Sequence, residues 1–399
     1  MDAQRDEVTV RNWVILAVAT FVAASGSAFI VGVGFLLPYF TTGMGLSLSR
    51  AGVLVAMPSV GMALALIAWG WLVDRTGEKL VLVSGSTAAA LAITALMFTD
   101  SFAAMAIFLL LAGAATASGN SASGRLVVGW FPPHRRGLAM GIRQMSQPVG
   151  AAIAAMSLPL LAQAHGLEAA FAVPLAMAVV SAVAALVVVD PPPPAAPRAT
   201  SASGTARSPY RGADYLQRIH GVSVLLVLPQ GMLQSFLLAW LVLGHGWSAV
   251  SAGAVVTLSQ ILGAAARIVA GWVSDRVGSR MAPIRGVAIA VTAGLAALAV
   301  AEAFGAPGAI AVTLGVVATV LSVSDNGLAF TAVAEYAGPR WSGRALGVQN
   351  TAQFVTISLA TPVIAVVIER FGYWPVFAGA AVIAAVAIPL VPRADRLRS

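Results

Sequence analysis

The chain has 399 residues, of which 59% are hydrophobic and 10% are charged, and its mean hydropathy is +0.89. Because a soluble domain carries about 25% charged residues, this composition excludes an ordinary soluble enzyme, a disordered scaffold and a secreted disulfide protein. The sequence contains no cysteine, which excludes thiol catalysis and cysteine metal clusters, and its net charge of +8 has to be interpreted against membrane topology.

Apolar stretches long enough to cross a hydrocarbon core of about 30 Å follow one another along the chain. The first stretch has no signal-peptide cleavage pattern, so we expect it to remain as a transmembrane helix. Charged, proline and glycine breaks define twelve predicted spans: 12–39, 50–73, 79–99, 102–130, 138–163, 168–189, 216–243, 250–274, 284–304, 308–334, 345–369 and 374–392. The sequence therefore predicts an all-α membrane protein.

A linker at residues 190–215 separates the sixth and seventh spans. It contains four consecutive prolines and then a stretch rich in Ser, Ala and Arg. Such a segment cannot bury apolar surface, so we expect a flexible linker between an N-terminal six-helix bundle at 1–189 and a C-terminal bundle at 216–399.

The basic residues indicate the orientation of the spans. If the chain crosses the membrane twelve times, 18 basic residues lie on the side of both termini, 2 lie on the other side and 3 lie inside the spans. The positive-inside rule then predicts that both termini and the linker are cytoplasmic. Because these charges are spread over short loops and two tails, we do not expect nucleic-acid binding.

The two halves contain an internal repeat. Residues 70–79 match residues 271–280 at an offset of 201, and at an offset of 206 Gln147 matches Gln353 and Asn120 matches Asn326. Many secondary transporters are built from duplicated halves. The sequence therefore predicts that one six-helix unit is used twice.

The repeated motif Gly-x-x-x-Asp-Arg-x-Gly-x-basic, between spans 2 and 3 and between spans 8 and 9, resembles the signature loop of the major facilitator superfamily. The resemblance covers essentially the whole chain. It implies two pseudo-symmetric six-helix bundles, with a central cavity bounded by spans 1, 2, 4, 5, 7, 8, 10 and 11. The family pattern usually ends in two basic residues, but Glu78 and Ser279 occupy the first of these places, so we expect a weakened charge contact there.

The resemblance also implies that the two loops form a conformational latch favouring the outward-facing state. The candidate latch residues are Gly70, Asp74, Arg75, Gly77, Gly271, Asp275, Arg276 and Gly278. Asp74 and Asp275 lie level with the starts of spans 5 and 11, whose unpaired amides carry partial positive charge. Gly70 and Gly271 are expected to allow close helix packing. The alternative is a plain turn with solvated ions.

Polar side chains inside the predicted spans are the candidates for a substrate cavity, because such groups are costly in hydrocarbon. They are Asn120, Arg125, Arg143, Gln147, Gln230, Gln234, Arg267, Asp325, Asn326, Asn350 and Gln353. For the amides the alternative is hydrogen bonding between helices, and for the arginines it is snorkelling to the cytoplasmic surface. Spans 3, 6, 9 and 12 are nearly free of such groups, so we expect them to face lipid.

Asp325 is the single acid in the interior of the predicted spans, away from their ends, and is the predicted proton-coupling residue. The alternative is a permanent ion pair with Arg267 or Arg143. Three guanidinium groups outnumber this one carboxylate, which favours a small organic anion or zwitterion as the solute, since Arg binds anions through its planar fork.

The sequence contains no phosphate loop, zinc helix motif or nucleophile elbow. We therefore predict no enzyme activity, no cofactor and no metal, and we interpret the four histidines as ordinary loop residues. The leading hypothesis is proton-coupled uptake of a small solute across a bacterial cytoplasmic membrane by alternating access. The alternatives are proton-coupled efflux and, from another class, a membrane sensor that does not transport.

The expected partners are the solute, a proton or other ion gradient and the lipid bilayer, and we expect a monomer. An excess of Arg over Lys of 22 to 1 indicates a GC-rich bacterial genome.

Overall fold

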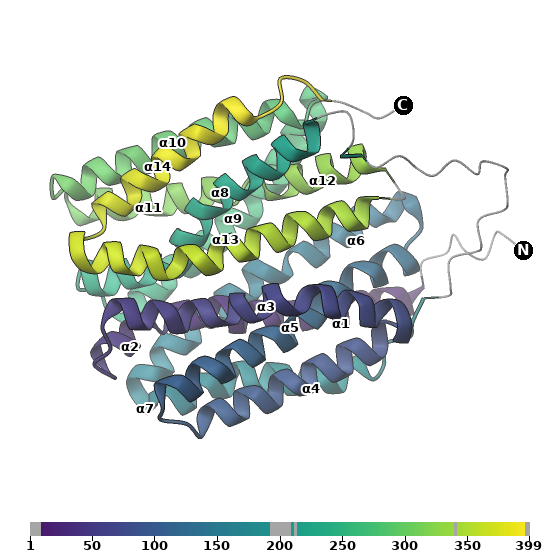
Figure 1. Cartoon of the computed structure of the whole chain (residues 1–399), viewed down its shortest axis with the longest axis horizontal. Helices are drawn as coiled ribbons and strands as arrows, with labels where there is room; N and C mark the ends of the chain where they lie inside the picture. The colour runs from purple at the N-terminus through teal and green to yellow at the C-terminus, as the bar shows by residue number, and fades with distance from the viewer. Residues whose placement is uncertain (1–8, 192–208, 211–213, 339–340, 396–399) are drawn as a thin grey trace, which may run out of the picture. The chain divides into compact units, whose positions relative to one another are not determined.

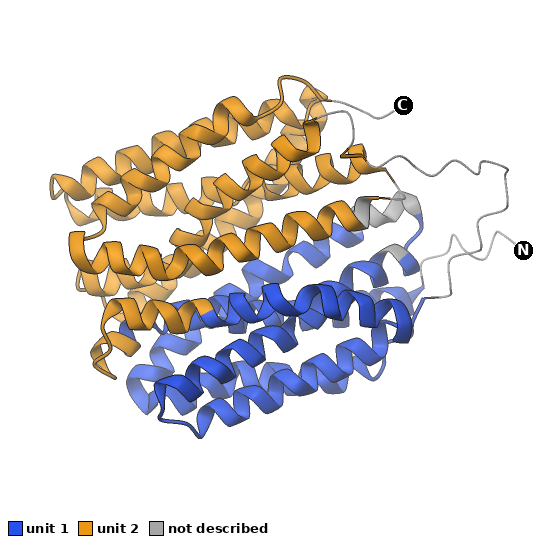
Figure 2. Ribbon diagram, in the orientation of Figure 1, with its two compact units in different colours: residues 1–39, 57–202 blue, residues 40–56, 203–399 orange. Residues whose placement is uncertain are grey.

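A computed structural model of the chain describes residues 9–191, 209–210, 214–338 and 341–395, without the side chains of residues 128, 133–138 and 342–343. In these ranges the chain is helical and contains no strand (Figure 1). It divides into two compact units, residues 1–39 with 57–202 and residues 40–56 with 203–399 (Figure 2). Most of the predicted linker at 190–215 lies outside the described residues.

The helices follow the predicted order along the chain. The first half contains α1 (Val10–Phe35), α2 (Leu37–Thr42), α3 (Leu48–Thr76), α4 (Glu78–Met97), α5 (Phe102–Trp130), α6 (Pro133–Gln144) and α7 (Ser146–Ala185). The second half contains α8 (Tyr215–Ala239), the π-helical turn η2 (Trp240–Gly244), α9 (Ala249–Val277), α10 (Met281–Ala303), α11 (Gly308–Ser322), α12 (Asn326–Ala337), α13 (Ser342–Phe371) and α14 (Trp374–Leu390).

Twelve membrane crossings can be traced through the described residues. Ten helices or merged helix pairs are long and apolar enough to cross a bilayer, and α14 is a shorter apolar helix. The longest of them, α7, contains two crossings, because the chain turns at Gly166 with φ 86° and ψ 179°. A positive φ of this size is open to glycine at little cost. The prediction of an all-α membrane protein is therefore confirmed.

Small residues bring the helices of the first unit close together. Gly150 in α7 faces the backbone of Ala24 in α1, and Gly113 in α5 faces the backbone of Pro58 in α3, with no room for a Cβ at either glycine. Helices in lipid gain most of their contact energy from such close packing, because lipid tails are as apolar as leucine.

One apolar cluster in the first unit joins five helices near the ends that adjoin the repeated loop. Its fully buried members come from α1, α3, α4, α5, the end of α7 and the residues after it: Ile15, Ala19, Val22, Val73, Val81, Leu82, Ala122, Leu126, Ala185 and Val188. The loop between α3 and α4 is therefore anchored on packed side chains.

In the second unit, α8 packs against both α13 and α14. Trp240, at the end of α8, is fully buried and fits against Gly315 of α11, where a Cβ would collide with the indole ring. The large aromatic side chain and the facing glycine together set the spacing of these helices.

The tenth predicted span, 308–334, is not one continuous helix in the structure. Helix α11 ends at Ser322 and α12 begins at Asn326. The intervening sequence is rich in Ser, Asp and Asn, whose side chains compete for backbone hydrogen bonds. Ser324 illustrates this, since its hydroxyl donates to the carbonyl of Val320 at 2.7 Å.

Replacing Gly113 with valine tests the close packing of α3 on α5. We expect Gly113→Val to destabilise the protein by about 1–3 kcal/mol, because the added atoms meet the Pro58 backbone. The thermal unfolding midpoint in detergent measures this loss. Gly286→Val is the control, because Gly286 in α10 has open space where a Cβ would stand. Equal midpoints for the two variants would contradict the packing argument.

Candidate transport site

The break between α11 and α12 holds the only carboxylate among the predicted cavity residues. Asp325 is 3% exposed and lies directly before α12. The side chain of its neighbour Asn326 donates to Gln230 Oε1 in α8 at 3.0 Å. From α9, Arg267 Nε donates to the carbonyl of Val323 at 3.1 Å, within the break itself. The structure thus brings together four predicted site residues from three helices and the break, Gln230, Arg267, Asp325 and Asn326.

Asp325 and Arg267 form the charged centre of this cluster. Arg267 bonds to the backbone two residues before Asp325, so the two charges interact; the carboxylate is buried and the arginine is half-buried. Asp325 Oδ1 is buried and accepts no hydrogen bond from any described residue. Leaving a buried acceptor unpaired costs about 1–3 kcal/mol. A proton on this carboxylate would reduce that cost, which makes the break a candidate site for proton uptake.

Polar side chains continue from this cluster along one face of α8. Gln353 in α13 donates to Ser223 Oγ at 2.6 Å, and His220 Nδ1 lies 3.2 Å from Gln349 Oε1. Positions 220, 223 and 230 recur at helical spacing, so these contacts form one seam on α8. His220, interpreted from sequence as a loop residue, therefore lies within a helix and pairs with α13. The helical spacing of the three positions was the available signal.

Two predicted cavity residues of the second unit stay outside this seam. Gln234 and Asn350 are half-buried, and neither forms a hydrogen bond with another described side chain. The geometry within the unit assigns them no partner.

The first unit has no equivalent charged cluster in the described residues. Arg143 Nε donates to Ser123 Oγ at 2.9 Å, and its Nη1 donates to Gln144 Oε1 at 2.9 Å. Asn120, the repeat counterpart of Asn326, is exposed and contacts the sulfur of Met62 at 3.5 Å. Gln147 is half-buried. The sequence repeat therefore does not produce a chemical repeat at this depth.

Arg125, predicted as a cavity residue, is engaged by the first repeated loop. Its Nε lies 2.9 Å from Glu78 Oε1, and its Nη1 pairs with Asp74. Glu78 is 3% exposed, so burial would leave its charge costly without this arginine. The expected weakening of the loop by Glu78 is therefore compensated by a basic residue on α5.

The second repeated loop makes the same kind of bridge with the charges exchanged. Here the arginine is in the loop, and Arg280 lies 2.5 Å from Asp275 and 3.2 Å from Glu335 of α12. Burial alone lowers the pKa of Arg280, but hydrogen bonds to Glu335 and Asp275 outweigh it, and the pKa is raised. The first loop is thus tied to α5 and the second to α12, each within its own unit.

Two further repeated contacts of these loops were not found from sequence. Asp190 accepts from the backbone N–H of Lys79 at 2.6 Å, and Asp395 accepts from that of Arg280 at 2.9 Å. Each aspartate therefore pairs with an otherwise unsatisfied amide at a helix start. The sequence does contain a signal for these contacts, an acid that follows the last helix of each half. That acid, however, lies far along the chain from the amide that it binds.

The remaining loop residues have local roles. The guanidinium carbon of Arg75 lies 3.8 Å from the ring centroid of Trp71, and that of Arg276 lies 4.2 Å from the ring centroid of Trp272. The two contacts form a repeated cation–π pair. Gly77 and Gly278 have φ of +86° and +66° and end the preceding helices. Gly70 and Gly271 have no atom within 4 Å of a Cβ position, so they do not mediate close packing within the described residues.

Comparison with known proteins agrees with this architecture. A family model described as Major Facilitator Superfamily matches residues 16–361. The chain belongs to this superfamily. It is 44% identical over 381 residues to an uncharacterised MFS-type transporter of Mycobacterium tuberculosis, covering 96% of this chain and 85% of the relative. It is 30% identical over 307 residues to a probable nitrate/nitrite transporter of the same species, covering 74% of each chain.

Among solved structures, a bacterial homologue of the human lysosomal transporter Spinster, in an inward-facing and unoccupied conformation, superposes with a TM-score of 0.78. The two share 14% sequence identity, and the match covers 96% of this chain and 97% of the other. At this identity the likeness shows the fold of two pseudo-symmetric six-helix bundles. As a member of the superfamily, the protein is a multi-pass membrane transporter with bacterial homologues.

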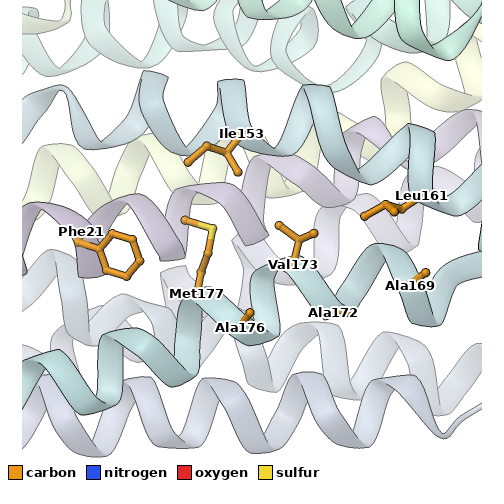
Figure 3. Close-up of a pocket in the computed structure, with 8 residues that line it drawn as sticks. All are labelled: Phe21, Ile153, Leu161, Ala169, Ala172, Val173, Ala176 and Met177. Carbon is orange, nitrogen blue, oxygen red and sulfur yellow. The ribbon is translucent and has the colours of Figure 1, made fainter.

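One groove in the first unit lies apart from the predicted transport residues. Its volume is about 540 Å³ (Figure 3). It lies between α1 and the two arms of α7 and is lined by Phe21, Ile153, Leu161, Ala169, Ala172, Val173, Ala176 and Met177. All eight side chains are apolar, so the groove offers no partner for a charged solute.

Removing the charge of Arg125 tests the bridge to the first loop. We expect Arg125→Gln to lower the free energy of unfolding by about 1–3 kcal/mol, since it leaves Glu78 buried without a counter-charge. The double variant Arg125→Gln/Glu78→Gln should recover most of the loss, because it removes both charges. Thermal midpoints of the three proteins decide this. A double variant less stable than Arg125→Gln would contradict the argument.

Proposed function

We propose that this superfamily member is a proton-coupled transporter of a small anion, with Asp325 and Arg267 at its solute and proton site. The observation that carries the proposal is a buried carboxylate with one unpartnered oxygen, set beside an arginine at a helix break. Broken helices near the middle of the bilayer are frequent sites of solute and ion binding in transporters.

The chemistry of Arg267 supports an anionic solute. Its guanidinium stays charged and presents a planar set of donors that suits carboxylate or nitrate. A relative of this chain is a probable nitrate/nitrite transporter, which agrees with this class of solute. A zwitterion that offers its carboxylate to Arg267 would use the same contact.

Charge balance explains how a proton and an anion would be coupled. Without solute, the charges of Asp325 and Arg267 cancel. When a proton neutralises Asp325, Arg267 gains one unbalanced charge, which a monovalent anion cancels. The empty and the loaded sites are then both neutral, whereas a site with the anion or the proton alone carries a charge that is costly in the membrane. One proton would therefore accompany each monovalent anion.

The transport cycle we propose is alternating access, in which the two halves rock about the site. The loops carrying Asp74 and Asp275 would act on the cytoplasmic side as latches of the outward-facing state, with Arg125 and Arg280 positioning their carboxylates. In this orientation both termini are cytoplasmic and the proton gradient drives uptake through a bacterial inner membrane.

Asp325→Asn tests proton coupling. In proteoliposomes assayed with nitrate and a panel of small carboxylates, we expect gradient-driven accumulation to fall at least about tenfold, while exchange across the membrane persists, because the amide cannot release a proton. Asp100→Asn, at an exposed loop carboxylate, is the control. Persisting accumulation in Asp325→Asn would overturn the coupling role, and gradient-driven expulsion by the unaltered protein would indicate efflux.

Arg267 is tested by two substitutions of graded severity. Arg267→Gln removes the charge that the anion cancels, so we expect loss of both accumulation and exchange. Arg267→Lys keeps the charge but loses the planar donors, so we expect anion affinity to weaken by about tenfold or more. Solute-dependent thermal stabilisation measures affinity directly. Arg344→Gln, on a residue stacked over Trp341, is the matched control. Unchanged exchange in Arg267→Gln would contradict an anion site here.

A further inference from the structure

The segment that begins α3 belongs by sequence to the first half but clusters with the second unit. Residues 40–56 form part of that unit, while α3 continues from residue 57 into the first unit (Figure 2). Helix α3 is therefore the one described helix that both compact units share. Its first turns lie at the membrane side opposite the repeated loops, the side that the basic residues predict to be external.

A carboxylate from α13 binds the start of this shared helix. Glu369, in the last turn of α13, accepts from the backbone N–H of Ser49 at 2.8 Å and from the Ser49 hydroxyl. The first-turn amides of a helix lack partners within the helix and carry partial positive charge. Glu369 satisfies one of them.

The next turn of each helix continues the same contact. Gly52 of α3 faces Ala365 of α13 so closely that a Cβ on Gly52 would collide with the Ala365 methyl. Ala365 is fully buried. Two successive contacts, Ser49 on Glu369 and Gly52 on Ala365, thus hold the start of α3 against the end of α13 in a defined register.

We propose that Glu369 is an outer latch, a carboxylate that holds the external end of α3 on α13 and has to release whenever the external side opens. The proposal rests on the alternating access of the proposed function, but not on Asp325, Arg267 or the identity of the solute. The contact of Glu369 favours a closed external side, whereas the two cytoplasmic loops favour the outward-facing state. The population of open and closed states then depends on carboxylates at both ends of the molecule.

The latch can be tested without any solute. The chain contains no cysteine, so Thr361→Cys introduces a single thiol at a position that is 3% exposed and next to Gly52. A membrane-impermeant maleimide is added from outside to cells carrying this reporter. Adding Glu369→Gln should raise the labelling rate by about three- to tenfold, since the neutral amide binds a helix start more weakly than a carboxylate.

Two further variants make the test decisive. Glu302→Gln changes another acid of the same side, which pairs with His245 at 3.3 Å, and should leave labelling unchanged. Gly52→Val blocks the close approach sterically and should raise labelling at least as much as Glu369→Gln. Increased labelling in Gly52→Val but not in Glu369→Gln would overturn the latch role of the carboxylate. Unchanged labelling in both variants would overturn the outer latch altogether.

This experiment separates the latch from the proposed transport chemistry. If Asp325→Asn still accumulates solute while Glu369→Gln labels faster, the coupling site is wrong and the outer latch stands. If Glu369→Gln labels like the unaltered reporter while Asp325→Asn loses accumulation, the latch is wrong and the coupling site stands.

Discussion

The cost of an unpaired polar group in hydrocarbon constrains this structure at every level. No water is available there to satisfy a backbone amide or a carboxylate, so the chain adopts helices and pairs nearly all its buried polar side chains. Where a helix breaks, as before Asn326, neighbouring side chains take over the freed groups, and Arg267 binds the carbonyl of Val323. Among the described side chains, Asp325 is the one carboxylate that keeps a buried oxygen without such a partner.

Duplication gave the two halves the same helices and loops, but their charged contacts have diverged. In the first unit a basic residue on a helix, Arg125, binds an acidic loop, and in the second a basic loop residue, Arg280, binds an acidic helix residue. Both arrangements satisfy the same physical requirement, which is to neutralise a charge near the membrane surface. The proposed site for solute and proton has no such counterpart in the first unit, because the second unit alone carries its carboxylate.

Helix ends recur as the places where carboxylates act. Asp190 and Asp395 cap the helices that follow the repeated loops, and Glu369 caps the start of α3 on the other side. In each case an acid from a distant part of the chain meets an amide that its own helix cannot satisfy. Such contacts are strong enough to hold a state and weak enough to break in a cycle, since a charge at a helix terminus contributes about 0.3–1 kcal/mol.

The sequence by itself determined the class, the twelve crossings, the internal repeat and the superfamily, because hydropathy and loop motifs are local properties of the chain. It also singled out Asp325, since one acid in an apolar segment is conspicuous without coordinates. Only the tertiary structure decided that helix α11 ends before Asp325, that Arg125 serves the loop at Glu78, and that Glu369 reaches Ser49. Partners separated by tens or hundreds of residues are set by packing between helices, and no local pattern encodes that packing.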